Sequence, residues 1–390
     1  MRVKTIKKLA KISDQTVLLR SDFNVPIEHG IIKDDFKIRK ALPTLNYLVN
    51  IGAKVVILTH LGRPEPGKDK RDLSTRPIAV RLSKYLKKTI KHLDVCHGFA
   101  VDTVVNKMKP GQIILLENIR FEPGELKNSK RLAKNLASIA KYYVNDAFAV
   151  SHRSHASIAA IKNYIPSFAG FIVAEEIKHL RRILQPKKPL ISVIGGVKLA
   201  TKMPLIRRLS RLSHRVLVGG ALANDFLAAH GLEIGKSVSS KKSIALAKRI
   251  HNKKIILPLD VVVSSREKKW RVRVVSVNKV NKNDYIFDIG PGTIKLYSKF
   301  IKQAKTILWN GPLGMFEDSH YKHGTLALAQ VIAARSTGKA FGVVGGGETI
   351  VALQATKMLE YVDFVSTGGG AMLSFLTGAK MPGLEGLYVK

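Results

Sequence analysis

Short apolar runs that end abruptly in polar residues recur through the first part of the chain. They cover residues 16–25, 53–64, 112–121 and 142–148. Segments with the apolar spacing of helices lie between them, at residues 38–51, 78–87 and 130–141. Strand-like segments that alternate with amphipathic helices predict β-α-β units, and therefore a parallel sheet with both faces covered.

The same alternation returns after residue 190, now with glycine at the strand ends. Glycine clusters follow apolar runs at residues 195–196, 219–220, 311–314, 345–347 and 368–370. Residues 157–189 show no comparable strand pattern, and the spacing up to residue 184 predicts one long helix that Pro186 and Pro189 end. We therefore predict an α/β fold of two doubly wound parallel-sheet (Rossmann-like) domains joined by a long helix and hinge.

Composition agrees with a two-domain protein and adds an unusual charge. The chain has 390 residues, of which 45% are hydrophobic, and a formal net charge of +38. Such a charge favours nucleic-acid binding, but Lys and Arg are spread along the whole length without interleaved aromatic residues, which is typical of a generally cationic surface. The single cysteine, Cys96, excludes a disulfide framework, and no apolar run reaches membrane-spanning length. We expect a cytoplasmic protein.

Cationic side chains gather at the predicted strand ends of the first half. His60 and Arg63 follow the second run, Arg120 ends the third, and Arg153 follows the fourth between two further histidines. The carboxyl ends of parallel strands meet at one sheet edge, where ligands bind. Such a cluster repels itself unless an anion fills it, and the guanidinium fork matches carboxylate and phosphate. This edge is a candidate pocket for a small, multiply charged acid.

The second half offers backbone amides instead. In residues 191–203 an apolar run ends in two glycines, and Lys198 and Lys202 follow one helical turn apart. Helical spacing would place both ammonium groups on one side, beside the free N–H groups of the first turn. Solvated lysines at an ordinary strand-to-helix turn are the alternative for this stretch alone. With the other glycine clusters, the pattern favours a polyphosphate and its nucleoside.

An acid pocket and a polyphosphate site, on two domains joined by a hinge, suggest phosphoryl transfer between them. The chain also resembles the phosphoglycerate kinases along essentially its whole length. The resemblance rests on D-F-N-V-P from Asp22, H-L-G-R-P from His60, L-L-E-N-I-R-F from Leu115, V-N-D-A-F and S-H-R-S-H within 144–155, G-G-V-K, W-N-G-P-L-G-M-F-E, G-G-G-E-T and S-T-G-G-G-A. It implies reversible glycolytic transfer between 1,3-bisphosphoglycerate with ADP and 3-phosphoglycerate with ATP, using Mg²⁺ and domain closure, in a monomer. The even spread of Lys and Arg predicts no dedicated nucleic-acid site.

The resemblance also implies a role for individual residues. Those expected around the glycerate acid are Asp22, Phe23, Asn24, Lys37, His60, Leu61, Gly62, Arg63, Arg120 and Arg153. Those expected at the nucleotide are Lys198, Lys202, Asn310, Glu317, Gly346, Gly347, Glu348 and Thr349, with Glu348 also serving the metal. Lys37 and Lys198 are the expected catalytic pair.

The expected division follows from the same resemblance. A 3-phosphoglycerate-binding domain spans residues 1–170, an interdomain helix and hinge spans 171–188, and a nucleotide-binding domain spans 189–373. The tail from about residue 374 to 390 is expected to pack back on the first domain.

The chain departs from the family pattern at three positions. Lys37 stands where the family has an arginine, Glu348 where many relatives have aspartate, and Ala221 where a third glycine is usual. Lysine keeps the charge but loses the planar, two-pronged contact of arginine. Two other interpretations stay open: a nucleic-acid-binding protein, because of the net charge of +38, and a catalytically impaired descendant with a regulatory role, because of Lys37.

Overall fold

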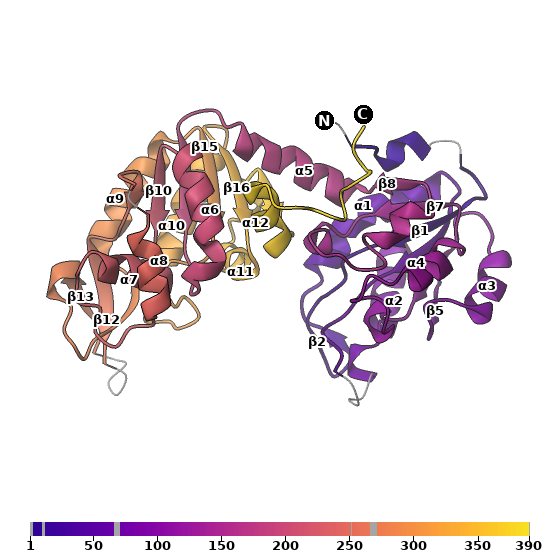
Figure 1. Cartoon of the computed structure of the whole chain (residues 1–390), viewed down its shortest axis with the longest axis horizontal. Helices are drawn as coiled ribbons and strands as arrows, with labels where there is room; N and C mark the ends of the chain where they lie inside the picture. The colour runs from indigo at the N-terminus through magenta and orange to yellow at the C-terminus, as the bar shows by residue number, and fades with distance from the viewer. Residues whose placement is uncertain (1–2, 10–11, 66–70, 251, 266–270, 390) are drawn as a thin grey trace. The chain divides into compact units, whose positions relative to one another are not determined.

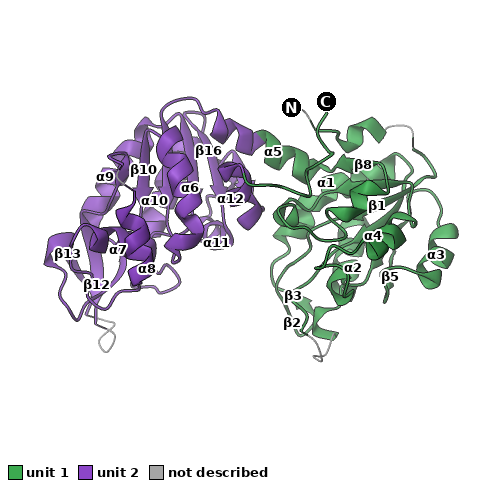
Figure 2. Cartoon of the chain, in the orientation of Figure 1, with its two compact units in different colours: residues 1–178, 379–390 green, residues 179–378 purple. Residues whose placement is uncertain are grey.

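The computed structural model of the chain describes residues 3–9, 12–65, 71–250, 252–265 and 271–389. The chain forms two compact units, residues 1–178 with 379–390 and residues 179–378 (Figures 1 and 2). Each unit contains a six-stranded sheet whose neighbouring strands are parallel. These sheets confirm the predicted fold class.

Unit 1 has the strand order β5-β6-β4-β1-β7-β8. Its strands are β1 (Thr16–Arg20), β4 (Lys54–Leu58), β5 (Ile90–Leu93), β6 (Ile113–Leu116), β7 (Tyr142–Asn145) and β8 (Ser167–Ala169), with a hairpin of β2 (Ile27–Glu28) and β3 (Ile31–Ile32). Its helices are α1 (Phe36–Asn50), α2 (Arg76–Leu86), α3 (Phe99–Asn106) and α4 (Lys130–Ala137). Short 3₁₀ turns are η1 (Ile6–Leu9), η2 (Arg71–Leu73), η3 (Ile119–Phe121), η4 (Phe148–Val150) and η5 (Ala160–Asn163).

Alternate residues of the unit 1 strands pack into two cores, one on each face of the sheet. Val17 and Leu19 of β1 pack in a core with apolar residues of α1 and α2. Leu18 packs in a second core with residues of α3 and α4. Because side chains alternate along a strand, helices on both faces bury the central strands of the sheet, whereas the edge strands β5 and β8 are partly exposed. In the central strands, mainly the ends are left for polar chemistry.

Unit 2 has the strand order β11-β10-β9-β15-β16-β17. Its strands are β9 (Leu190–Ile194), β10 (Arg215–Val218), β11 (Ile255–Ile256), β15 (Thr306–Asn310), β16 (Phe341–Gly345) and β17 (Phe364–Ser366). Its helices are α6 (Leu199–Leu212), α7 (Ala221–Ala229), α8 (Lys241–Lys248), α9 (Pro291–Gln303), α10 (His323–Ser336), α11 (Gly347–Ala355) and α12 (Gly370–Thr377), with 3₁₀ turns η6 (Val277–Lys279) and η7 (Leu359–Tyr361).

Several structural features were not predicted from the sequence, among them β5 and α3 of unit 1 and β11 of unit 2. Unit 2 carries a small antiparallel sheet, β13-β12-β14, formed by Arg273–Ser276, Asp260–Ser264 and Tyr285–Ile289. In unit 1, β8 pairs with β7 inside the stretch that we expected to lack strands. β8 has three residues, which is too short to show a period of two.

The long helix α5 (Phe171–Leu184) follows β8, and the boundary between the units falls within it. Unit 1 holds the beginning of α5 through two side chains. Phe171 N–H donates to Thr44 Oγ1 at 3.1 Å, and Ile172 N–H donates to Asp146 Oδ1 at 2.8 Å. Free amides at a helix start need such acceptors, so Asp146 fixes how α5 leaves unit 1.

The C-terminal tail lies with unit 1. Gly383 N–H donates to the Ser151 carbonyl at 2.8 Å, and Asn145 Nδ2 donates to the Gly383 carbonyl at 3.0 Å. Val3 and Tyr388 form an isolated bridge near the two ends of the chain. In the described residues, no helix is both long and apolar enough to span a membrane.

We expect Asp146 to make the stability of unit 1 depend on pH. Burial, partly opposed by its hydrogen bonds to Thr44, Ile172 and Val173, raises the pKa of Asp146 from 3.8 to about 6. A raised pKa means that the folded state binds the proton more tightly, so this stabilisation is complete below pH 3.8 and is lost as the pH rises to about 6.

Asp146→Asn should remove this dependence. Relative to wild type, the free energy of unfolding of the variant should gain about 3 kcal/mol between about pH 4 and pH 7. Urea unfolding at several pH values measures it, and Asp102→Asn, at an exposed position of α3, is the control. Parallel pH profiles for wild type and Asp146→Asn would contradict the assignment.

Candidate active site

A buried arginine organises the carboxyl end of β1. Arg20 is 1% exposed and extends from the last position of the strand. Its Nε donates to Ser157 Oγ at 3.0 Å, its Nη1 to the Ser21 carbonyl at 2.5 Å, and its Nη2 lies 3.2 Å from His60 Nδ1. The sequence analysis did not select Arg20 as a site residue, because it ends an apolar strand whose other residues form the core.

These contacts fix the state of His60. A guanidinium has only donors, so His60 Nδ1 must accept from Arg20, and Nε2 carries the ring proton. Burial, followed by the charge of Arg20, holds the pKa of His60 well below 6.5. The 4.0 Å separation between His60 Nδ1 and Asp22 Oδ1 is therefore no ion pair. His60 is a neutral N–H donor at this sheet edge.

Asp22, Asn24 and Lys37 come together beyond β1. Asp22 Oδ2 binds Lys37 Nζ at 2.8 Å, and Asp22 Oδ1 accepts from the Asn24 amide at 3.0 Å. Asn24 Oδ1 in turn accepts from the Gly62 amide at 2.9 Å. Burial is the largest single influence and would raise the pKa of Asp22, but the neighbouring positive charge, mainly of Lys37, and the hydrogen bonds from Lys37 and Asn24 together outweigh it and lower the pKa to about 2. Because β1 ends at Arg20, Asp22 and Asn24 lie beyond the strand, and the hydrogen bond from the Asn24 amide to the Asp22 side chain brings them together.

Phe23 and Leu61 are 0% and 3% exposed, so their side chains belong to the core and only their backbone borders the site. Asn118, which the sequence analysis did not select, positions the loop after β4. Its Oδ1 accepts from the Leu61 amide at 3.2 Å, and its Nδ2 donates to the Leu61 carbonyl at 2.7 Å. A polar residue directly after the apolar run of β6 was the available signal for this role.

Arginines crowd together next to this loop. Arg120 Nη1 donates to the Gly62 carbonyl. Burial, and then the charges of Arg20 and Arg153, lower the pKa of Arg120 to about 10. Arg153 Nε is buried and has no hydrogen-bond partner among the described residues, whereas Arg63, directly after Gly62, is exposed. An anion bound here would neutralise the mutually repelling arginines and accept a hydrogen bond from the unpaired, buried Arg153 Nε.

Two glycine turns meet at the centre of the unit 2 sheet. Gly195 follows β9 and Gly311 follows the neighbouring strand β15. A Cβ atom on Gly195 would overlap the Pro312 carbonyl oxygen, and one on Gly311 would overlap the Gly195 carbonyl and the ammonium group of Lys202. Only glycine lets these backbones approach so closely.

Lys198 and Lys202 have different environments, contrary to the expectation that they share a helix face. Lys198 precedes α6 with an extended backbone, φ −101° and ψ 98°, and is exposed. Lys202 lies in the first turn, and its Nζ donates to the carbonyls of Gly195 at 2.5 Å and Asn310 at 3.2 Å. Burial lowers the pKa of Lys202 to about 8. Lys202 therefore holds the glycine turns, while Lys198 remains exposed to solvent.

Four helices begin at this edge without a side-chain cap. They are α6, α7, α11 and α12. By contrast, serines cap α4 and α8 elsewhere in the molecule. Uncapped helix starts leave N–H groups available to a ligand, and the helix dipole favours an anion there. Gly346, with φ +104°, and Gly347 form the start of α11.

A cavity of about 430 Å³ adjoins these helix starts. The cavity is lined by the apolar residues Leu227, Val238, Phe287 and Leu313. The acidic residues Glu317 and Glu348 also line it. Thr349 and Asn310 are buried beside it. Thr349 Oγ1 accepts from the Gly311 amide at 2.7 Å, and Asn310 Oδ1 has no hydrogen-bond partner among the described residues. An apolar cavity next to free amides suits a nucleoside with a phosphate chain.

Comparison with known proteins gives one consistent result. The family model described as phosphoglycerate kinase matches residues 6–379. The phosphoglycerate kinase of Dictyoglomus turgidum is 42% identical over 400 residues and 100% of both chains, and that of Borreliella burgdorferi is 40% identical with 99% of each chain covered. The solved structure of phosphoglycerate kinase from Coxiella burnetii matches with a TM-score of 0.87 at 37% identity, over 98% of each chain.

Proposed function

The chain belongs to the phosphoglycerate kinase family, and from this membership we propose how its own residues carry out the reaction. The reaction is the reversible glycolytic transfer of a phosphoryl group between 1,3-bisphosphoglycerate with ADP and 3-phosphoglycerate with ATP. The observation that carries the assignment of residues is the contrast between the two sheet edges. One edge has crowded cations, and the other has uncapped helix starts beside a cavity.

Unit 1 binds the glycerate acid in this proposal. Arg63, Arg120 and Arg153 bind its phosphate and carboxylate groups, because their guanidinium forks match both. His60 donates from Nε2 as a neutral group, and Asn24 orients the loop through Gly62. Asp22 belongs to the same acid site and also holds Lys37 through an ion pair.

Unit 2 binds the nucleotide. The base and ribose occupy the 430 Å³ cavity, where the carboxylate of Glu317 accepts from ribose hydroxyls. The phosphates bind the amides at the starts of α6 and α11, with Gly346 and Gly347 leaving room for them. Thr349 accepts from the Gly311 amide, and Lys202 donates to the Asn310 carbonyl, so these side chains and backbone groups hold the neighbouring turn in place.

Mg²⁺ fits this site through Glu348. Mg²⁺ in nucleotide sites takes one or two carboxylates together with phosphate oxygens and water. Glu348 is exposed, lies in the first turn of α11 and lines the nucleotide cavity, so its carboxylate is available for such binding. When bound with the nucleotide, the ion supplies neutralisation of phosphate charge.

In the forward kinase direction, a carboxylate oxygen of 3-phosphoglycerate attacks the γ-phosphorus of ATP, and the bond to the bridging oxygen breaks to release ADP. The acceptor is already ionised, so no general base is needed. Lys198 and Lys37 stabilise the charge on the moving phosphoryl group. The two bound substrates must meet, and we infer that closure of the two units brings them together and excludes water. We further propose that the enzyme acts as a monomer in the cytoplasm.

Assay of the purified protein tests the proposal. It should form ATP from ADP and 1,3-bisphosphoglycerate, with saturation in both substrates. If the folded protein binds both ligands but does not turn over, the impaired-descendant interpretation replaces ours. If it binds neither ligand but retains nucleic acid on a filter at moderate salt, the nucleic-acid interpretation replaces ours.

Lys37→Arg should raise kcat severalfold. Arginine can contact the moving phosphoryl group with two parallel donors, whereas lysine offers a point charge. Arg39 does not substitute for it, because its Nε binds Asp35 at 2.8 Å. Steady-state kinetics measures the change, with Lys33→Arg as the control for a nearby exposed lysine. An unchanged or lower kcat in Lys37→Arg would show that lysine performs this role fully.

A further inference from the structure

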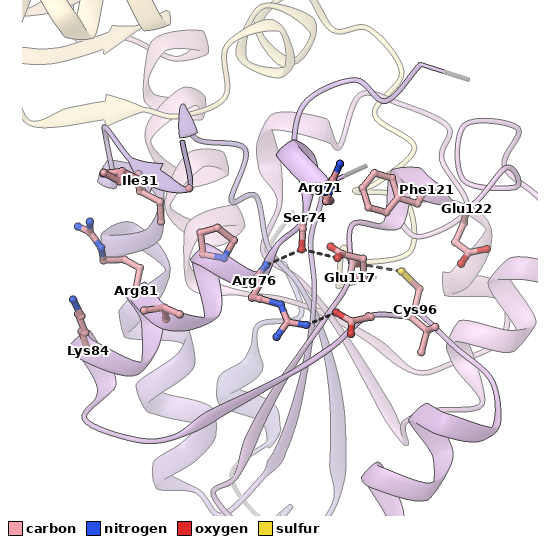
Figure 3. Close-up of a pocket in the computed structure, with 16 residues that line it drawn as sticks. Ile31, Arg71, Ser74, Arg76, Arg81, Lys84, Cys96, Glu117, Phe121 and Glu122 are labelled. Carbon is pink, nitrogen blue, oxygen red and sulfur yellow. Dashed lines mark hydrogen bonds and ion pairs between the residues drawn. The ribbon is translucent and has the colours of Figure 1, made fainter. Parts of the chain in front are cut away.

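A histidine and two carboxylates meet at the other end of the unit 1 sheet edge. His92 lies in β5, Asp94 follows that strand, and Glu117 follows the neighbouring strand β6. One donor atom from each residue lies within 4.8 Å of the others. Asp94 and Glu117 also line a cavity of about 1070 Å³, drawn in Figure 3. None of the three is assigned to the acid or the nucleotide.

The hydrogen bonds of Thr75 determine the state of the His92 ring. Thr75 Oγ1 lies 2.9 Å from the Leu116 carbonyl and 3.1 Å from Glu117 Oε1, and both of these can only accept. The single hydroxyl proton of Thr75 is therefore already used. His92 Nε2, 3.0 Å from the same hydroxyl, must then donate to it. The other ring nitrogen, Nδ1, is left with a lone pair.

That lone pair faces a carboxylate. His92 Nδ1 lies 3.2 Å from Asp94 Oδ1, yet it is buried and has no hydrogen bond among the described residues. The side chain of His92 is only 4% exposed, so water does not separate the two atoms. Asp94 Oδ1 also accepts from Arg76, and its contact with Nδ1 is repulsive unless a proton or a metal cation lies between the two atoms. Donor atoms bound to one tetrahedral zinc ion lie about 3.3 Å apart, which agrees with this contact.

The surrounding groups resemble those that support a metal site. Glu117 is oriented by Ser74 Oγ, which donates to Oε2 at 2.7 Å, and by the Thr75 amide, which donates to Oε1 at 2.8 Å. Thr75 fixes the tautomer of His92, as the second hydrogen bond of a metal-binding histidine does. Arg76 is a competing cation, because its Nη2 donates to Asp94 Oδ1 at 2.7 Å.

We propose that His92, Asp94 and Glu117 form a binding site for one divalent transition-metal ion of the zinc class. The nitrogen and oxygen donors are those that zinc prefers, and three protein ligands leave one position open toward the cavity. The bound ion joins the ends of β5 and β6 to Ser74 and Thr75 at the start of α2. None of the three ligands is assigned to phosphoryl transfer, and the expected effect of the ion is on the stability of unit 1.

Titration of the full-length, chelator-treated protein with Zn²⁺ alone, without nucleotide, tests the site. Calorimetry should give one ion per chain at micromolar affinity, and Zn²⁺ should raise the melting temperature. Co²⁺ in its place should give the visible absorption of a tetrahedral complex. Binding no tighter than millimolar, or a Co²⁺ spectrum of the hydrated ion, would overturn the proposal.

Variants locate the ion. Asp94→Asn and His92→Gln should each weaken Zn²⁺ binding at least tenfold, and Asp94, whose side chain is 72% exposed, is the safer substitution for folding. Arg76→Gln should strengthen binding, because it removes a competing cation from Asp94. His97→Gln, in the nearby His97–Glu122 pair, is the matched control and should change nothing. Equal affinities in wild type, Asp94→Asn and Arg76→Gln would place the ion elsewhere and refute the site.

Discussion

Lys198→Ala should lower kcat about 10²–10³-fold while changing the Kd for ATP only a few-fold. Lys198 is exposed just before the uncapped start of α6, so in the resting protein water solvates its ammonium group. Its charge gains importance when negative charge develops on the moving phosphoryl group. An interaction that forms only in the transition state raises kcat without tightening ground-state binding.

Steady-state kinetics together with equilibrium ATP binding measures both quantities for Lys198→Ala. Arg207→Ala, at an exposed position farther along α6, is the matched control and should leave both unchanged. Lys202→Met provides a contrast, since Lys202 binds two backbone carbonyls and its loss should weaken nucleotide binding itself. If Lys198→Ala lost binding and turnover equally, Lys198 would be an ordinary binding residue.

Arg120→Gln should raise the KM for 3-phosphoglycerate about 10- to 100-fold, because a charged hydrogen bond to the acid contributes about 1.5–3 kcal/mol. In the absence of ligand, by contrast, the same substitution should stabilise the folded protein. Burial and the charges of Arg20 and Arg153 already lower the pKa of Arg120, which shows that its charge is disfavoured without a ligand. Removing it relieves repulsion that a bound anion would otherwise neutralise.

The two effects can be measured separately. The melting temperature of Arg120→Gln relative to wild type should rise as salt is lowered, because less screening strengthens the repulsion in wild type. Arg131→Gln, at an exposed position of α4, is the control for a simple change of net charge. If the variant kept the wild-type KM, Arg120 would not bind the acid. If the difference in melting temperature did not depend on salt, repulsion between the arginines would not explain it.

The sequence predicted most strands of the parallel sheets because those strands are largely apolar and helices of clear period separate them, whereas β5 mixes apolar and polar residues and was not predicted. It also predicted the edge on which the polar residues gather, since His60, Arg120 and Arg153 all follow strands of one sheet. β8 escaped prediction because three residues carry no measurable period. The small antiparallel sheet of unit 2 escaped because partly exposed strands such as β13 lack the continuous apolar pattern.

The contacts and protonation states of individual side chains could not be predicted from the sequence. Arg20 was visible at a strand end, but only the structure shows that it binds His60 Nδ1 and so sets its tautomer. Lys198 and Lys202 have helical spacing, yet α6 begins one residue after Lys198, so the predicted shared face does not exist. Asp146 lay within a recognised motif, whereas its hydrogen bond to the start of α5 depends on a contact 26 residues away.

Amide hydrogen exchange with one ligand at a time tests the central claim most directly, namely that the two substrates bind at different sheet edges. With 3-phosphoglycerate alone, we expect protection at residues 22–24, 60–63, 118–122 and 152–155. With ATP and Mg²⁺ alone, we expect protection at residues 195–199, 311–317 and 346–349. Protection of the same unit by both ligands would contradict the account.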